Sequence, residues 1–132
     1  MQTRLPAALA VTPVGQEADQ ILRRCVHCGF CNATCPTFRL TGDESASPRG
    51  RIAAMSAVEA GIVEVDDRFD EVTGSCLQCR ACVTACPSMV PYGRLIEGAR
   101  HEVAVVLPGG RTTLRRPLVV PQLDLRVEGL RS

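Results

Sequence analysis

Eight cysteines carry the clearest chemical signal in the sequence, and they fall into two runs of identical spacing. Each run reads C-x2-C-x2-C-x3-C-P, and the second begins 51 residues after the first. The candidate ligands are Cys25, Cys28, Cys31 and Cys35 in the first run, and Cys76, Cys79, Cys82 and Cys86 in the second. No cysteine lies outside the two runs, so one repeated pattern accounts for every thiol.

The spacing predicts two [4Fe–4S] clusters with interlocked ligands. Three thiolates at three-residue steps curl around one cubane, whereas the fourth cysteine of such a run ligates the other cluster. The proline that follows the fourth cysteine ends any helix and keeps that cysteine out of the α region, which aims its sulfur elsewhere. We therefore expect one cluster on Cys25, Cys28, Cys31 and Cys86, and a second on Cys76, Cys79, Cys82 and Cys35.

Zinc and disulfides are the alternatives for these thiols. A zinc site usually presents two C-x2-C pairs separated by a longer loop, which three cysteines at successive x2 steps do not resemble. A disulfide framework requires an oxidising compartment, and the apolar N-terminal stretch, interrupted at Pro6, is too short for a signal peptide. No apolar run approaches the ~18–20 residues of a membrane span. We expect a cytoplasmic protein, with association at the inner face of the membrane as the alternative.

Residues beside the cysteines predict that the two clusters differ. Gly29 stands between Cys28 and Cys31, whereas Arg80 occupies the matching position of the second run. Arg80 either raises the potential of the second cluster by stabilising its reduced state or simply faces solvent. The thiolates already form full ligand sets, so His27 is expected outside them. The segment at residues 48–51, P-R-G-R, is either a turn that covers a cluster or an ordinary helix start with solvated arginines.

Helical periodicity dominates the rest of the chain, and residues 16–103 show no continuous β alternation. A polar loop is expected at residues 41–48, followed by a helix with Ile52, Met55 and Val58 on one face and Gly61 as its terminator. The other expected helices span residues 16–24, 66–72 and 94–103. The fold class is mainly α, with an N-terminal extension (1–15), a domain (16–103) and a tail of unknown order (104–132).

Composition limits what else the chain can do. Its 132 residues suit one domain, and the net charge of +1, in which every basic residue is arginine, gives no sign of a polyanion partner. Three Phe, one Tyr and no Trp leave little aromatic core, so a metal or cluster staple would help folding. The sequence has no dinucleotide fingerprint, no P-loop and no triad, so we expect no catalytic site of its own.

Several motifs together resemble one known family. They are C-V-H-C-G-F-C-N-A-T-C-P-T (25–37), G-D-E (42–44), P-R-G-R-I (48–52), C-L-Q-C-R-A-C-V-T-A-C-P-S (76–88) and V-P-Y (90–92). They resemble the N-terminal ferredoxin-like region of glycolate oxidase iron–sulfur subunits, which are similar to iron–sulfur subunits of anaerobic glycerol-3-phosphate dehydrogenase and of heterodisulfide-reductase type. The resemblance implies the α-helical ferredoxin fold, because a βαββαβ ferredoxin would not accommodate the roughly forty-residue insert between the runs.

The resemblance also implies a role in electron transfer. Two [4Fe–4S] clusters would accept electrons from an FAD-binding subunit that oxidises a 2-hydroxy acid such as glycolate or lactate, and would pass them toward an acceptor such as quinone. No nucleic acid and no transmembrane segment is expected. Arginines including Arg49, Arg51 and Arg94 are expected to supply docking contacts to carboxylates of the partner.

The chain departs from that family in one respect. Those subunits continue into a C-terminal region with C-C-G-type motifs, whereas this chain has no cysteine after Cys86. Two alternatives therefore stand beside the subunit hypothesis: an independent ferredoxin-type carrier, or a truncated fragment of a larger iron–sulfur oxidoreductase subunit. Any function of the C-terminal region is not carried over to this chain.

Overall fold

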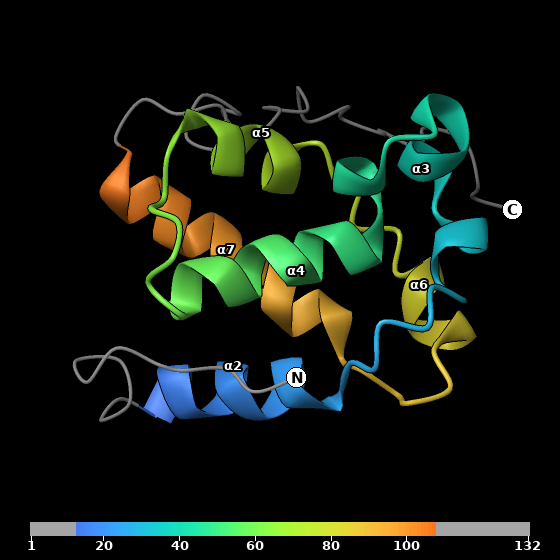
Figure 1. Cartoon of the computed structure of the whole chain (residues 1–132), viewed down its shortest axis with the longest axis horizontal. Coiled ribbons are helices and arrows are strands. Elements are labelled where there is room, and N and C mark those ends of the chain that lie inside the picture. Colours follow the sequence, from blue (N-terminus) through green and yellow to red (C-terminus); the bar gives the residue numbers. More distant parts are fainter. Residues whose placement is uncertain (1–12, 108–132) are drawn as a thin grey trace, which may run out of the picture.

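The computed structural model describes the backbone of residues 13–107 and the side chains of residues 16–107 (Figure 1). Within that range every regular element is a helix, which confirms the mainly α prediction. The elements are α2 (Pro13–Arg24), η1 (Asn32–Thr34), α3 (Pro36–Thr41), η2 (Glu44–Ala46), α4 (Pro48–Glu59), α5 (Asp67–Gly74), α6 (Ala81–Ala85) and α7 (Tyr92–Val106). The expectations for residues 1–12 and 108–132 lie outside the described residues.

Helix α4 runs through the middle of the fold, between α2 and α5 in Figure 1. Ser47 caps its start by accepting a 2.9 Å hydrogen bond from the Gly50 amide, and Pro48 occupies the first turn, where its missing N–H costs nothing. A Cβ on Gly50 would lie 1.9 Å from the carbonyl oxygen of Glu44, so glycine allows α4 to pack directly on η2. Gly61 follows the helix with φ +70°, as expected of its terminator.

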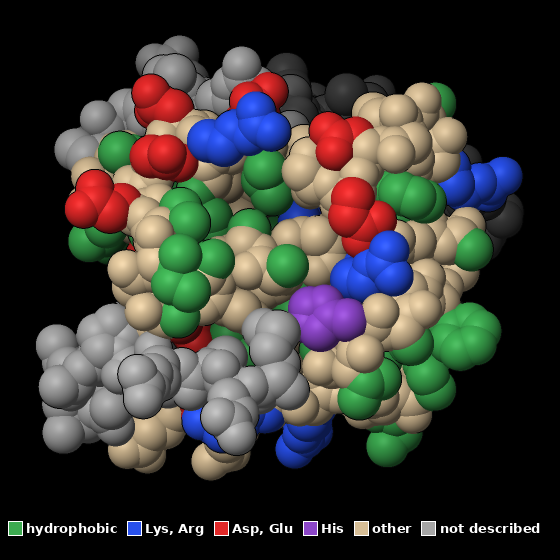
Figure 2. Space-filling view, viewed as in Figure 1, with side chains coloured by type: hydrophobic (Ala, Val, Ile, Leu, Met, Phe, Trp, Pro, Cys, Tyr) green, Lys and Arg blue, Asp and Glu red, His purple; other side chains and the backbone are tan. Residues whose placement is uncertain are grey.

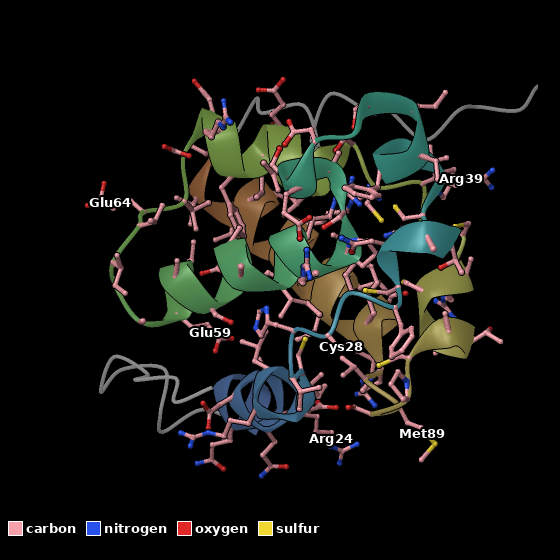
Figure 3. All side chains as sticks on the ribbon, turned by 45° about the vertical axis from the view of Figure 1, so that its right-hand side comes forward. Arg24, Cys28, Arg39, Glu59, Glu64 and Met89 are labelled. Carbon is pink, nitrogen blue, oxygen red and sulfur yellow. The ribbon has the colours of Figure 1, made fainter. Side chains whose placement is uncertain are left out.

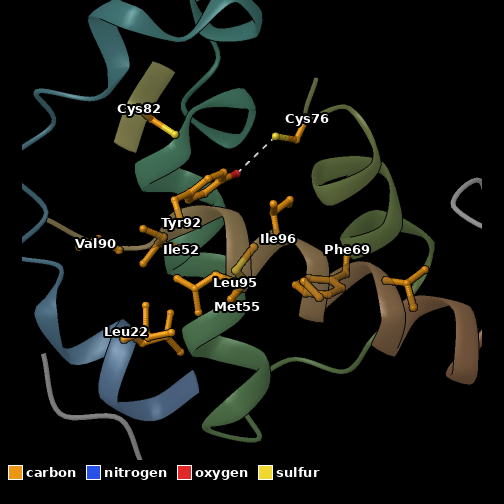
Figure 4. Close-up of a cluster of buried hydrophobic side chains, with 13 residues drawn as sticks. Leu22, Ile52, Met55, Phe69, Cys76, Cys82, Val90, Tyr92, Leu95 and Ile96 are labelled. Atoms are coloured by element: carbon orange, nitrogen blue, oxygen red, sulfur yellow. Dashed lines mark hydrogen bonds between the residues drawn. The ribbon is translucent and has the colours of Figure 1, made fainter. Parts of the chain in front are cut away.

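The hydrophobic core lies where α2, α4, α5 and α7 meet (Figure 4). Leu22 and Val103 are fully buried, and Ile52, Phe69 and Ile96 pack with them. Phe69 and Tyr92 are the two aromatic side chains in this buried cluster. The core is therefore mostly aliphatic, and it extends to the buried thiols of Cys76 and Cys82.

The longer helices agree with the sequence predictions to within a few residues. The helix expected at residues 94–103 begins at Tyr92 and ends at Val106. The helix expected at 66–72 is α5, and Asp66 is its N-cap, whose carboxylate accepts a 2.9 Å hydrogen bond from the Phe69 amide. No helix of the described residues is long and apolar enough to cross a membrane.

Two short helices, α3 and α6, and the two 3-10 turns were not expected. Helix α3 has six residues and α6 has five, so neither is long enough to show an amphipathic repeat. The loop predicted at residues 41–48 contains η2. Helices α3 and α6 lie on the right of Figure 1, on the side of the molecule opposite the C-terminal end of α7. The cysteine runs adjoin these short helices in the sequence.

Candidate metal centre

The structure gathers the eight cysteines around two adjoining cavities. Cys25, Cys28, Cys31 and Cys86 line the first cavity, to which Cys82 also contributes. Cys35, Cys76, Cys79 and Cys82 line the second cavity. Each cavity therefore contains three cysteines of one run together with the fourth cysteine of the other run. All eight are free thiols. Within the described residues, no group of three or more His, Cys, Asp or Glu side chains is arranged to hold a metal ion.

The fourth cysteines owe their direction to the backbone before each proline. Cys35 has φ −81° and ψ 117°, and Cys86 has φ −80° and ψ 114°, so both are extended. Each follows a short helix, η1 or α6, that ends there, as expected for a residue before proline. The repeated sequence thus produces a repeated local structure.

The loops between the first cysteines of each run share an unusual conformation. His27 (φ +54°) and Gln78 (φ +56°) occupy matching positions in the left-handed region, as do Gly29 (φ +82°) and Arg80 (φ +61°). Residues other than glycine rarely adopt this backbone region. Alternation of right- and left-handed residues turns successive backbone N–H groups toward one concave side, which binds anions and Fe–S clusters. In the sequence, only Gly29 indicated that the backbone of these loops approaches the cluster.

Burial and repulsion between neighbouring thiolates both raise thiol pKa values, and the repulsion reflects how close the cysteines lie to one another. Burial raises the pKa of the Cys31 thiol, and neighbouring Cys25 and Cys86 raise it further. Burial raises the pKa of Cys82 to about 12, and Cys31 and Cys76 add to this rise. Cys82 thus interacts electrostatically with cysteines of both sets. Pro48, Cys82 and Tyr92 line both cavities, so the cavities are separated by little more than these side chains.

Arg51 dominates the surroundings of the second cavity. Its side chain is buried, with 1% of the residue exposed, although a docking contact was expected of it. That expectation is wrong, because the guanidinium points inward and bonds the Val72 carbonyl (2.8 Å), the Ser75 hydroxyl (2.9 Å) and the Thr37 hydroxyl (3.1 Å). Its Nη1 also lies 3.9 Å from Cys35 Sγ.

Hydrogen bonds reach the sulfurs of the second cavity from several directions. Burial alone raises the pKa of the Cys35 thiol, but hydrogen bonds from Thr37, the Phe38 amide and Arg51 outweigh it and hold that pKa below its usual range. The Gln78 amide donates to Cys76 Sγ at 3.4 Å, and the Tyr92 hydroxyl lies 3.7 Å from the same sulfur (Figure 4). Burial, followed by the neighbouring Cys76, raises the pKa of Tyr92, so the phenol keeps its proton.

Arg49 covers the first cavity in a different way. Its Nε donates to Glu44 Oε1 at 2.5 Å, and its Nη1 donates to the His27 carbonyl at 3.3 Å. Glu44 also accepts from Asn32 (3.1 Å) and Ser47 (3.2 Å). A Cβ on Gly29 would lie 2.6 Å from Arg49 Nη1, so glycine leaves room for this cover. The P-R-G-R segment therefore both starts α4 and covers the cavities, and its arginines are not simply solvated.

The remaining arginines singled out from the sequence lie on the surface. The Arg80 side chain is 64% exposed and pairs with Glu97 at 2.8 Å at the edge of the second cavity. Of the two roles considered for it, the solvent-facing one describes its position. Arg94 is exposed and pairs with Glu17 at 2.9 Å. His27 lines the first cavity.

Comparison with known proteins supports the same centre. Residues 21–90 match the family described as a 4Fe-4S dicluster domain. The chain is 46% identical over 132 residues to the glycolate oxidase iron-sulfur subunit of Escherichia coli (strain K12), covering 100% of the chain and 30% of that relative. It is 50% identical over 80 residues to the probable glycolate oxidase iron-sulfur subunit of Bacillus subtilis (strain 168), covering 60% of the chain and 18% of the relative.

A third relative is more distant: lactate utilization protein B of Bacillus pumilus is 29% identical over 96 residues, which cover 71% of the chain and 19% of the relative. The chain spans less than a third of the length of each of these relatives. No solved structure is significantly similar to it. The resemblance to glycolate oxidase iron–sulfur subunits is thereby confirmed, and the chain belongs to the 4Fe-4S dicluster domain family, whose iron–sulfur chemistry its eight cysteines match.

Proposed function

We propose that the chain holds two [4Fe–4S] clusters, one on Cys25, Cys28, Cys31 and Cys86 and the other on Cys76, Cys79, Cys82 and Cys35. The observation that carries this proposal is that each cavity is lined by one of these sets of four. The left-handed residues of both runs add support, because strained backbone persists where its N–H groups serve an anionic group. The fully buried Arg51 adds more, because a buried cation needs a negative charge nearby.

The clusters would make the chain a relay for electrons. A [4Fe–4S] cluster supplies one-electron transfer when bound. Around it, the chain keeps the two ligand sets close, because Pro48, Cys82 and Tyr92 border both cavities. Cys28 and Cys79, one from each set, are exposed. The relay would thus come near the surface at two places, as a path between two partners requires.

Apolar side chains surround these exposed cysteines. Val26 and Phe30, on either side of Cys28, are each 68% exposed, and Leu77, two residues before Cys79, is 61% exposed. Figure 2 shows exposed apolar side chains gathered at the edge of the molecule near α6, and Figure 3 shows Met89 pointing outward on the same side. Desolvated contact over such side chains would bring a partner's redox group close to a cluster.

The proposed partner is an FAD-binding subunit that oxidises a 2-hydroxy acid. Support comes from the names of the relatives, two of which are glycolate oxidase iron–sulfur subunits and one a lactate utilization protein. A flavin that accepts a hydride holds two electrons, and two one-electron clusters can take both. An acceptor such as quinone, reached at the inner face of the membrane, would complete the path.

The test is to mix the anaerobically reconstituted chain with the flavoprotein subunit and glycolate, and in parallel with D-lactate, and to follow visible absorbance. Reduction of the clusters, seen as bleaching, is the expected result. A reduced flavin beside clusters that stay oxidised, even after the C-terminal region of the relatives is supplied, would contradict the partnership and favour an independent carrier. Bleaching that requires that region would identify the chain as a fragment with an intact relay.

A further inference from the structure

We propose that Arg51 gives the cluster on Cys35, Cys76, Cys79 and Cys82 the higher reduction potential, so that a single electron on the chain resides there. This inference rests on the two-cluster ligation proposed above and adds an order to the two clusters. It follows from how differently the two cavities are supplied with positive charge and with hydrogen-bond donors.

The positive charge at the second cavity is buried, and within the part of the chain that the structure describes it is not paired with a carboxylate. The four acceptors around the Arg51 guanidinium are the Val72 carbonyl, the hydroxyls of Thr37 and Ser75, and Cys35 Sγ. None of these is a carboxylate, and water does not screen a side chain that is 1% exposed. Burial of such a charge is unfavourable unless an opposite charge lies nearby. The cavity that Arg51 lines is the place for that charge.

The positive charge at the first cavity is largely neutralised. Arg49 pairs with the Glu44 carboxylate, and its side chain is 35% exposed. An ion pair presents little net charge to the cavity, and solvent screens what remains. Arg80 borders the second cavity, but its charge is likewise screened by solvent and paired with Glu97. Among Arg49, Arg51 and Arg80, Arg51 is therefore the one whose charge acts most strongly on a cluster.

Hydrogen bonds to sulfur point in the same direction. In the second cavity, Cys76 Sγ is approached by the Gln78 amide and the Tyr92 hydroxyl, and Cys35 Sγ by Arg51. In the first cavity, the side-chain contact of Cys31 Sγ is with Asn32 Oδ1 at 3.6 Å, which is an acceptor. Backbone N–H groups of Cys31 and Arg49 also donate to this sulfur, but they carry no formal charge. Donors to the sulfurs and nearby charge both tune cluster potentials.

Reduction makes this asymmetry matter. One electron, delivered by the reduced flavin of the partner or by dithionite in the test below, enters a cluster without bond formation or proton uptake. The charge of a cubane with its four thiolates then goes from about −2 to about −3. A fixed buried cation stabilises the more negative state more strongly, because the Coulomb energy grows with the product of the charges. The cluster beside Arg51 is thus reduced first.

The experiment is a redox titration of the anaerobically loaded chain, followed by EPR, after iron and acid-labile sulfide have been measured. Arg51→Gln is expected to lower the midpoint of one reduction step by at least 59 mV, which is a tenfold change in the equilibrium of a one-electron couple. Arg51→Lys retains the charge and should shift it less. The matched control Arg80→Gln also removes a charge at this cavity, but that charge is exposed and paired. It should shift the midpoint by less than 59 mV.

The reduction step that shifts must be that of the cluster beside Arg51. That step is identified because it is absent from the titration of Cys35→Ala. A loaded Arg51→Gln variant with both midpoints unchanged, or with the other step shifted, overturns the inference. If Arg51→Gln does not retain its clusters, single-cluster variants decide: the cluster left in Cys86→Ala must have a higher midpoint than the one left in Cys35→Ala. Equal or reversed midpoints overturn the role of Arg51, whereas a parent chain without iron and sulfide contradicts the proposed function itself.

Discussion

Cys35 and Cys86 adopt the same extended backbone conformation at matching positions of the two runs, and each lines the cavity formed by the other run. This exchange ties the loops between α2 and α3 to those between α5 and α7. The two halves of the repeat are thus cross-linked by whatever the cavities bind. With the clusters bound as proposed, folding, cluster binding and the distance between the two clusters would be coupled through these two residues.

Exchange of the fourth cysteines predicts which thiols are released when one of them is removed. In Cys35→Ala we expect loss of about four of about eight irons and exposure of Cys76, Cys79 and Cys82, because their cluster loses its fourth ligand. Alkylation of the native protein, followed by peptide mapping, identifies the released thiols.

The reciprocal variant, Cys86→Ala, provides the control. It should release Cys25, Cys28 and Cys31 and leave the second-run thiols protected. If Cys35→Ala released the other thiols of its own run instead, the interlocked ligation would be wrong.

The left-handed backbone at Gln78 predicts an unusual response to substitution. Gln78→Val should destabilise the loaded protein by about 1–2 kcal/mol, because a β-branched side chain tolerates positive φ poorly. Gln78→Gly should cost much less or stabilise the protein, since glycine adopts this region freely. The thermal midpoint of cluster absorbance measures both, with Leu77→Val as the control at an exposed neighbour whose φ is not positive. Equal midpoints for Gln78→Val and Leu77→Val would remove the argument from backbone strain.

Removal of iron should unfold much of the described domain. The core is small and aliphatic, it includes Cys76 and Cys82, and Arg51 would be left as a buried cation beside an empty cavity. When no site exists in the unfolded chain, the free energy of metal binding is also free energy of folding. Far-UV circular dichroism before and after anaerobic chelation measures the loss of helix. An iron-free chain with undiminished helicity and a cooperative thermal transition would refute this dependence.

Glu59 at the end of α4 predicts a pH dependence remote from the cysteines. Burial, with smaller contributions from Asp19 on α2 and Glu102 on α7, raises its pKa to about 7, and its Oε2 is buried with no hydrogen-bond partner among the described residues. The folded state therefore holds a proton that the unfolded state releases at lower pH. This contribution is fully present below the unfolded pKa and is lost as pH rises toward about 7 and above.

Glu59→Gln should abolish that loss. The variant should match the parent near pH 4 and exceed its stability at pH 8 by on the order of 1–2 kcal/mol, after allowance for partial solvent screening. Thermal midpoints at the two pH values provide the measurement. A variant that is less stable than the parent at pH 8 would show that the ionised Glu59 carboxylate stabilises the fold through a favourable partner.

The sequence predicted the longer helices because their apolar positions recur over several turns. It could not predict α3 and α6, which are shorter than two turns and therefore show no amphipathic repeat. The grouping of the cysteines was predictable in outline, because proline restricts the residue before it and the repeat doubles the constraint. Both runs then had to fold alike, as the matched φ values of His27 and Gln78 illustrate.

The role of the arginines was not predictable from the sequence. Arg49 and Arg51 are two residues apart in the first turn of α4, so they point in different directions, and only the packing of η2, α3 and α5 determines which of them is buried. The sequence left open whether they lie in a turn that covers a cluster, are solvated, or supply docking contacts. The same limit applies to Tyr92, because nothing in the sequence indicated that its hydroxyl reaches Cys76 Sγ.

The most direct test of the account is the iron and acid-labile sulfide content of the chain, purified or reconstituted without oxygen. Two complete sets of four thiolates predict about eight irons and about eight sulfides per chain. Bound zinc without sulfide, or about four of each with four cysteines open to alkylation, would contradict the two-cluster account.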